Sequence, residues 1–102
     1  GYDLTRALLT KGRPRALLCL NDRLAFGAYQ ALGEAGLTIP GDVAMVSFDN
    51  DELASYLRPG LTTIALPHEA MGRKATELLL GGKQKSPALV PMPVVTRGSL
   101  PA

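Results

Sequence analysis

The chain has 102 residues, of which 46% are hydrophobic and 20% are charged, and its net charge is +2. These values suit one globular unit, or part of one, and exclude a disordered chain and a surface built mainly to hold a polyanion. The single cysteine, Cys19, excludes an internal disulfide and fits a cytoplasmic protein. The sequence has neither a long apolar run nor a signal-peptide start, so we expect no membrane partner.

The first predicted elements are a helix and a strand. Residues 2–11 have the spacing of an amphipathic helix that ends at Gly12. The apolar face of this helix carries Leu4, Leu8 and Leu9. Residues 16–20 form an apolar run that predicts a strand, and this strand ends on the polar residues Asn21 and Asp22.

A second helix is predicted over residues 23–35, before Gly36. Its apolar stripe consists of Leu24, Ala28, Ala31, Leu32 and Ala35. Phe26 and Tyr29 lie off this stripe, so the helix has an aromatic second face that a monomer would not need to bury.

The middle of the chain predicts a buried strand and two shorter elements. Residues 43–48 are nearly continuous in apolar side chains, as expected for a central strand that is covered on both faces. Residues 51–57 predict a short helix, and residues 61–65 predict a brief extended segment.

The last third of the chain predicts one more helix and a restricted strand. Residues 67–80 have helical spacing, and residues 83–87 predict a polar loop. Residues 90–96 predict a final strand, which Pro91 and Pro93 confine to an edge or to a crossing position.

The alternation of helices and strands predicts an α/β protein with a mainly parallel sheet. In such sheets ligands bind beyond the carboxyl ends of the strands, and we expect Asn21, Asp22 and Asp49 to lie there on one edge. A carboxylate can accept from two neighbouring hydroxyls or ring N–H groups, and an Asn side chain both donates and accepts. This chemistry suits a sugar or a nucleobase-like ligand.

Helix capping is the alternative role for these polar residues. We expect Asp22 to be a cap, and for Asn21 both roles stay open. For Asp49 we favour contact with a ligand, because Asn50 and Asp51 are available as caps.

Enzyme and metal chemistry have little support in this sequence. Ser47, Ser55 and His68 could join Asp49 in a catalytic set, but no Gly-x-Ser-x-Gly elbow accompanies them. The lone Cys and the lone His lack the spacing of metal ligands, and no glycine-rich phosphate loop is present, so we expect no enzyme, metal or cofactor. We interpret Ser47 as a packing residue and His68 as a surface or cleft-edge residue. For Arg97 the two roles are a ligand or hinge contact and a solvated terminal charge, and we favour the solvated charge.

Five segments stand in the order and at the spacing of one protein family. They are residues 21–28, 35–43, 48–50, 59–64 and 94–99, which read NDRLAFGA, AGLTIPGDV, FDN, PGLTTI and VVTRGS. Together they resemble the LacI/GalR family of bacterial transcription regulators.

The resemblance implies a two-lobed fold of the periplasmic-binding-protein-like type I, of which this chain would be an incomplete fragment from the C-terminal part of the effector-binding domain. Residues 1–64 and about 88–102 would form most of the C-terminal lobe, a three-layer lobe around a parallel sheet. Residues from about 65 to 87 would contribute a helix to the N-terminal lobe.

The resemblance also implies a function. The chain would bind a small polar effector, which we expect to be a sugar, through Asn21 and Asp49, and would act on operator DNA through a module that this chain lacks. It would form a homodimer through Phe26, Tyr29, Tyr56 and Leu57. A sugar-binding protein of a transport system, with the same fold, is the alternative. A small α/β enzyme or phosphoacceptor domain that uses Asp22 and Asp49 is a more distant one.

Overall fold

The computed structural model describes residues 1–82 and 87–101, so the predicted polar loop at 83–87 lies almost entirely outside the described residues. The elements in chain order are α1 (Tyr2–Leu9), β1 (Ala16–Leu18), α2 (Asp22–Glu34), β2 (Ala44–Asp49), η1 (Glu52–Ser55), β3 (Thr62–Ala65), α3 (His68–Gly81) and β4 (Val94–Val95). Each of the predicted helices and strands is present, with boundaries that differ by a few residues.

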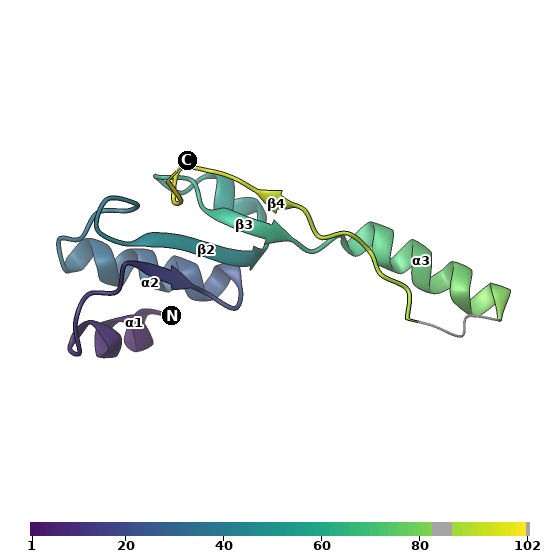
Figure 1. Ribbon diagram of the computed structural model, residues 1–102, viewed down its shortest axis with the longest axis horizontal. Coiled ribbons are helices and arrows are strands. Elements are labelled where there is room, and N and C mark those ends of the chain that lie inside the picture. The colour runs from purple at the N-terminus through teal and green to yellow at the C-terminus, as the bar shows by residue number, and fades with distance from the viewer. Residues whose placement is uncertain (83–86, 102) are drawn as a thin grey trace.

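The four strands form one sheet in the order β1-β2-β3-β4 (Figure 1). The first three strands are parallel, and β4 pairs antiparallel with β3 at the edge. This confirms the mainly parallel α/β sheet and the central place of β2. The last strand is shorter than predicted, since Pro91 and Pro93 have no N–H to donate to a neighbouring strand.

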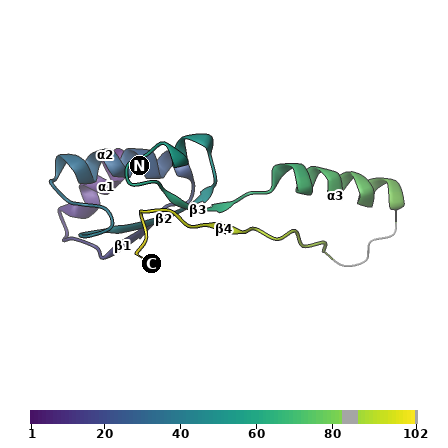
Figure 2. The same ribbon diagram turned by 90° about the horizontal axis from the view of Figure 1, so that it is seen from above.

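Both α1 and α2 lie on one side of the sheet (Figure 2). The core lies between α2 and the sheet, and its buried members are Ala25, Ala28, Leu32, Val43, Met45, Ala54 and Leu61. On the other face of β2, Val46 and Phe48 stay partly exposed. Within residues 1–82 and 87–101, helices therefore cover one face of β2. The sequence predicts cover on both faces, so this prediction is met on one face only.

Of the apolar face predicted for α1, which consists of Leu4, Leu8 and Leu9, only Leu9 packs against the core. The buried residue of α1 is Thr5, and Leu9 packs against the core, whereas Leu4 is 72% exposed. The helix instead approaches α2 closely at Gly27, where a Cβ atom would stand 2.5 Å from the backbone nitrogen of Tyr2. The exposed leucines of α1 line an open apolar groove with the free edge of β1; its lining includes Leu4, Leu8, Leu17, Leu18, Cys19 and Leu20.

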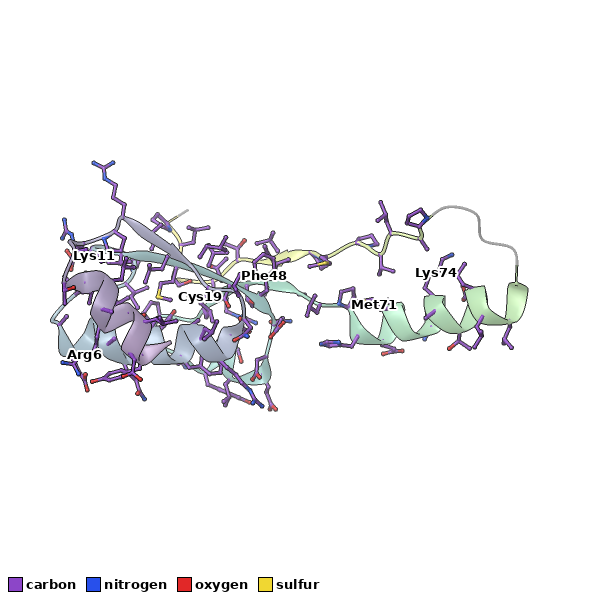
Figure 3. The ribbon with its side chains drawn as sticks, turned by 90° about the horizontal axis from the view of Figure 1, so that it is seen from below. Arg6, Lys11, Cys19, Phe48, Met71 and Lys74 are labelled. Carbon is purple, nitrogen blue, oxygen red and sulfur yellow. The ribbon has the colours of Figure 1, made fainter. Side chains whose placement is uncertain are left out.

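The chain divides into a lobe and an arm. The lobe consists of residues 1–65 and 94–101, and the arm consists of residues 66–82 and 87–93, which extend away from the lobe along the 54 Å axis of the molecule (Figure 1). No residue of α3 is buried, and Met71 and Lys74 lie far from the side chains of the lobe (Figure 3). Among the described residues, no helix has both the length and the apolar character needed to cross a membrane.

Candidate functional site

The candidate site is an open cavity of about 530 Å³ at the carboxyl edge of the sheet, where the lobe meets the arm. Because β1 and β2 are parallel, Asn21 after β1 and Asp49 at the end of β2 lie on this same edge, as the sequence predicts. The lining residues are Arg23, Asp49, Asn50, Asp51, Glu52 and His68. Asn21 is not among them.

Asn21 is the N-cap of α2. Its Oδ1 accepts a hydrogen bond of 2.9 Å from the backbone N–H of Leu24, while its backbone is extended. Of the two roles left open for this residue, capping is the one that the structure displays.

Asp22 is not a helix cap, and the prediction that it caps α2 is wrong. Its side chain is fully buried, with Oδ2 accepting from the backbone N–H of Asp51 at 2.7 Å and Oδ1 accepting from the hydroxyl of Thr63 at 2.8 Å. The carboxylate therefore ties the start of α2 to the turn after β2 and to β3. Capping falls to Asn21 because it stands one residue earlier, where the backbone is extended.

Asp49 and Asn50 form a turn in an uncommon backbone conformation. Their φ angles are 114° and 56°, and a non-glycine residue held at positive φ costs on the order of 1 kcal/mol or more. The next residue, Asp51, caps η1 through a 2.9 Å bond from the N–H of Leu53 to its carboxylate. Asp51 therefore takes the capping role, as the expectation of a ligand contact for Asp49 requires.

Arg97 is fixed by side-chain hydrogen bonds, so its interpretation as a solvated terminal charge is wrong. Its guanidinium donates to the carbonyl oxygen of Leu61 at 2.8 Å and to Oδ1 of Asn50 at 2.9 Å. The hydrocarbon part of the side chain covers Gly60, where a Cβ atom would stand 3.1 Å from Cδ of Arg97. Sequence reasoning missed this contact, because nothing in the sequence pairs residue 97 with residue 50.

The cavity has a mixed charge. Arg23 and His68 are exposed and contribute a guanidinium and an imidazole, and His68, the first residue of α3, extends the lining onto the arm. This agrees with the interpretation of His68 as a cleft-edge residue. The acidic residues of the lining are Asp49, Asp51 and Glu52. Such a site offers both acceptors and donors to a polar ligand of several hydroxyls.

The aromatic side chains of α2 are used within the lobe. Phe26 and Tyr29 pack against the core, and the hydroxyl of Tyr29 donates to the carbonyl of Pro59 at 3.0 Å. Burial raises the pKa of the Tyr29 phenol to about 12. Both rings are therefore partly covered within the lobe, although the sequence predicts a face that a monomer would not need to bury. Tyr56 remains 64% exposed, and Leu57 is partly buried.

Ser47 is a buried strand residue, as predicted, and its hydroxyl has no hydrogen-bond partner within the described part of the chain. The same part of the chain contains no group of three His, Cys, Asp or Glu side chains placed to hold a metal ion.

Residues 2–100 match the family described as "Periplasmic binding protein-like domain". The lactose operon repressor of Rhizobium radiobacter is 43% identical over 81 residues, which cover 78% of this chain and 72% of that protein.

Solved structures give the same result. The Lac repressor dimer bound to operator and the anti-inducer ONPF has a TM-score of 0.89 and 32% identity over 99% of this chain. A LacI family regulator from Enterococcus faecium with bound ribose has a TM-score of 0.82 and 36% identity over 97% of this chain. The chain spans only 37% and 38% of those two proteins. The fold, the family match and the identity to repressors together establish that this chain belongs to the LacI/GalR family, whose effector-binding domain is periplasmic-binding-protein-like.

Proposed function

We propose that this chain is the effector-sensing and dimerisation portion of a cytoplasmic transcription regulator that binds a sugar at the cavity beside Asp49. The observation that carries the proposal is that Asp49 lines an open polar cavity between lobe and arm. A carboxylate there can accept hydrogen bonds from two adjacent sugar hydroxyls. A relative with bound ribose supports this class of ligand.

The division of the chain is part of the proposal. Residues 1–64 and about 88–102 would belong to the C-terminal lobe, and residues from about 65 to 87 would pack against a second lobe. The lack of any buried residue in α3 supports this division, since its apolar side chains then have a surface to cover elsewhere. The cavity would lie between the two lobes.

The mechanism would be a population shift. A sugar that binds one arrangement of the lobes more tightly than another moves the protein toward that arrangement. The backbone offers a route, because the N–H of Leu66, where the arm begins, lies 3.4 Å from the carbonyl oxygen of Asp49. The shift would reach operator DNA through a module outside this chain, as the solved relative bound to operator suggests.

Asn21 enters the proposal as a second contact from the same edge of the sheet. Its Oδ1 is engaged in the cap, so the contact would be made by its amide NH2 group.

The test of effector binding is a thermal-shift and calorimetric comparison of the full-length protein with ribose, lactose and free nucleobases. Asp49→Ala should weaken binding of the active compound by about tenfold to a hundredfold, because a charged hydrogen-bond acceptor is lost. Asp3→Ala is the matched control, since Asp3 is an exposed acid of α1 that does not line the cavity. Equal affinities for the two variants would overturn the assignment of Asp49.

The proposed dimer interface consists of Phe26, Tyr29, Tyr56 and Leu57, and Tyr56 is its most exposed aromatic side chain. Tyr56→Glu should convert a full-length dimer to a monomer in analytical ultracentrifugation, because it places a charge in an apolar contact. Phe26→Glu should do the same, but Phe26 also packs against the core. An unchanged mass for Tyr56→Glu would contradict this interface.

A further inference from the structure

We propose that Arg97 is a positioning residue of the effector site, which holds Asn50 and thereby the turn that presents Asp49 to the cavity. This inference rests on the proposed function of Asp49 and adds a residue that lies outside the cavity lining. It starts from the two consecutive positive φ angles at Asp49 and Asn50, which persist only if the surroundings hold them.

Two anchors hold the main chain of this turn from inside the lobe. The N–H of Asn50 donates to the hydroxyl of Thr63 at 3.1 Å, and the N–H of Asp51 donates to the carboxylate of Asp22 at 2.7 Å. Thr63 and Asp22 are fully buried and are themselves joined by a 2.8 Å hydrogen bond. These anchors fix the peptide N–H groups after Asp49 but leave the side chain of Asn50 unconstrained.

Arg97 supplies the third anchor, from the segment that returns along the arm to the sheet. One guanidinium nitrogen donates to Leu61 O and the other to Asn50 Oδ1, so the planar group links the residue before β3 to the turn. Its own backbone is locked by Thr62, whose hydroxyl donates to Arg97 O at 3.0 Å and accepts from Arg97 N at 2.8 Å. The guanidinium is therefore attached to a backbone segment that is itself held in place.

A purely structural role for Arg97 makes a different prediction. If Arg97 only clips the C-terminal segment to β3, its loss should affect the turn equally whether or not residue 50 has a side chain. If it positions the turn through Asn50, its loss should matter only while the Asn50 amide is present. Asn50→Gly removes that amide and still accepts a positive φ without strain.

The first experiment needs no ligand. In the full-length protein, hydrogen exchange of the Asn50 and Asp51 amides is compared among the natural protein, Arg97→Met, Asn50→Gly and the double variant. Arg97→Met should accelerate exchange by about tenfold, since a charge-assisted hydrogen bond is lost. In the Asn50→Gly background the same change should add less than about twofold, because the shared contact is already absent.

Arg13→Met is the matched control, because Arg13 forms its salt bridge with Asp42, before β2 begins, at the opposite edge of the sheet. The proposal is overturned if Arg97→Met accelerates exchange of these amides no more than Arg13→Met does. It is also overturned if Arg97→Met accelerates exchange equally with Asn50 and with Gly at position 50. If Arg97→Met does not fold, Arg97→Lys keeps the charge and the packing over Gly60 but loses the planar fork, and it should accelerate the same amides by about threefold or more. No acceleration in the folded lysine variant likewise overturns the proposal.

The second experiment measures binding of ribose and lactose by calorimetry with the same four proteins. Arg97→Met should weaken binding by about tenfold, and by less than about twofold when Asn50 is already Gly. If neither sugar binds the natural protein, the sugar assignment fails, and the exchange data still decide whether Arg97 holds the turn. If a sugar binds and Arg97→Met leaves its affinity unchanged, the positioning role is overturned while Asp49 keeps its proposed role.

Discussion

The helices α2 and α3 have similar lengths, 13 and 14 residues, yet only the helix in the lobe buries side chains. Five residues of α2 are buried, beneath the parallel sheet, whereas none of α3 is. An isolated helix of this length is marginal in water, so helical order in the arm depends on a surface that it covers. The comparison teaches that the lobe buries side chains against its own sheet, whereas α3 buries none among the described residues, which is what we expect if it packs against the proposed second lobe.

The strongest test of this difference between lobe and arm is to truncate one methionine in each region. Met45→Ala, in the fully buried core, should lower the free energy of unfolding by about 2–5 kcal/mol. Met71→Ala, at 45% exposure on the arm, should change it by less than about 0.5 kcal/mol. Urea denaturation of the 102-residue chain measures both, and equal losses would mean that the arm shares the core of the lobe.

A second pair compares acidic side chains. Asp22→Ala should cost about 3 kcal/mol, since two hydrogen bonds to a buried carboxylate are lost and their donors stay buried. Glu69→Ala, in the exposed ion pair with Arg73 on α3, should cost less than about 0.5 kcal/mol. Chemical denaturation of both variants is the measurement, and a small effect of Asp22→Ala would contradict its role as a structural tie.

Burial of Tyr29 predicts how the stability of the lobe depends on pH. Because burial raises the phenol pKa from 10.0 to about 12, the stability from its neutral form is complete below pH 10 and is lost as the pH rises toward 12. Tyr29→Phe should cost about 1 kcal/mol at pH 7, where the hydrogen bond to Pro59 is lost, and should flatten the alkaline decline. Melting temperatures between pH 8 and 11.5 would test this, and an unchanged alkaline decline would contradict it.

The smallest effect concerns hydroxyl groups. Ser47→Ala should raise stability by up to about 1 kcal/mol, because it removes a buried hydroxyl with no partner within the described residues. On the arm, the hydroxyl of Thr76 is exposed and bonds to the carbonyl of Gly72, so Thr76→Ala should change stability by about 0.5 kcal/mol or less. A loss of stability in Ser47→Ala would mean that this hydroxyl has a partner after all.

Periodicity and turn residues were sufficient to predict the elements and the central place of β2, since the apolar run at 43–48 and the helix-ending Gly36 are local signals. They did not predict which face of α1 packs. The choice between Leu4 and Thr5 depends on how closely α1 approaches α2, and that distance is set by Gly27, far away in the sequence. Nonlocal packing of this kind leaves no periodic signal.

The sequence predicts which edge of the sheet carries the site, but it does not predict the hydrogen bonds that hold the site together. Strand ends place Asn21 and Asp49 on one edge by geometry alone. The choice of Asn21 over Asp22 as the cap, and the link from Arg97 to Asn50, depend on backbone angles and on contacts between residues far apart in the chain. Because adjacent Asn and Asp are equally good caps by residue type, only the backbone decides between them.

The antiparallel pairing of β3 with β4 has a practical consequence. Ile64 faces Val94 in the ladder, and the N–H of Ala65 donates to Pro93 O at 2.8 Å, so the two strands form a hairpin whose loop is the whole arm. Joining Ala65 to residue 93 through a tight Asn-Gly turn, with Pro93→Val to supply the N–H that closes such a turn, would replace that loop by the shortest connection that such a ladder accepts. The product would be a miniature protein in which the sheet, its two covering helices and the Asp49 turn are retained, suited to solution NMR and to grafting as a module.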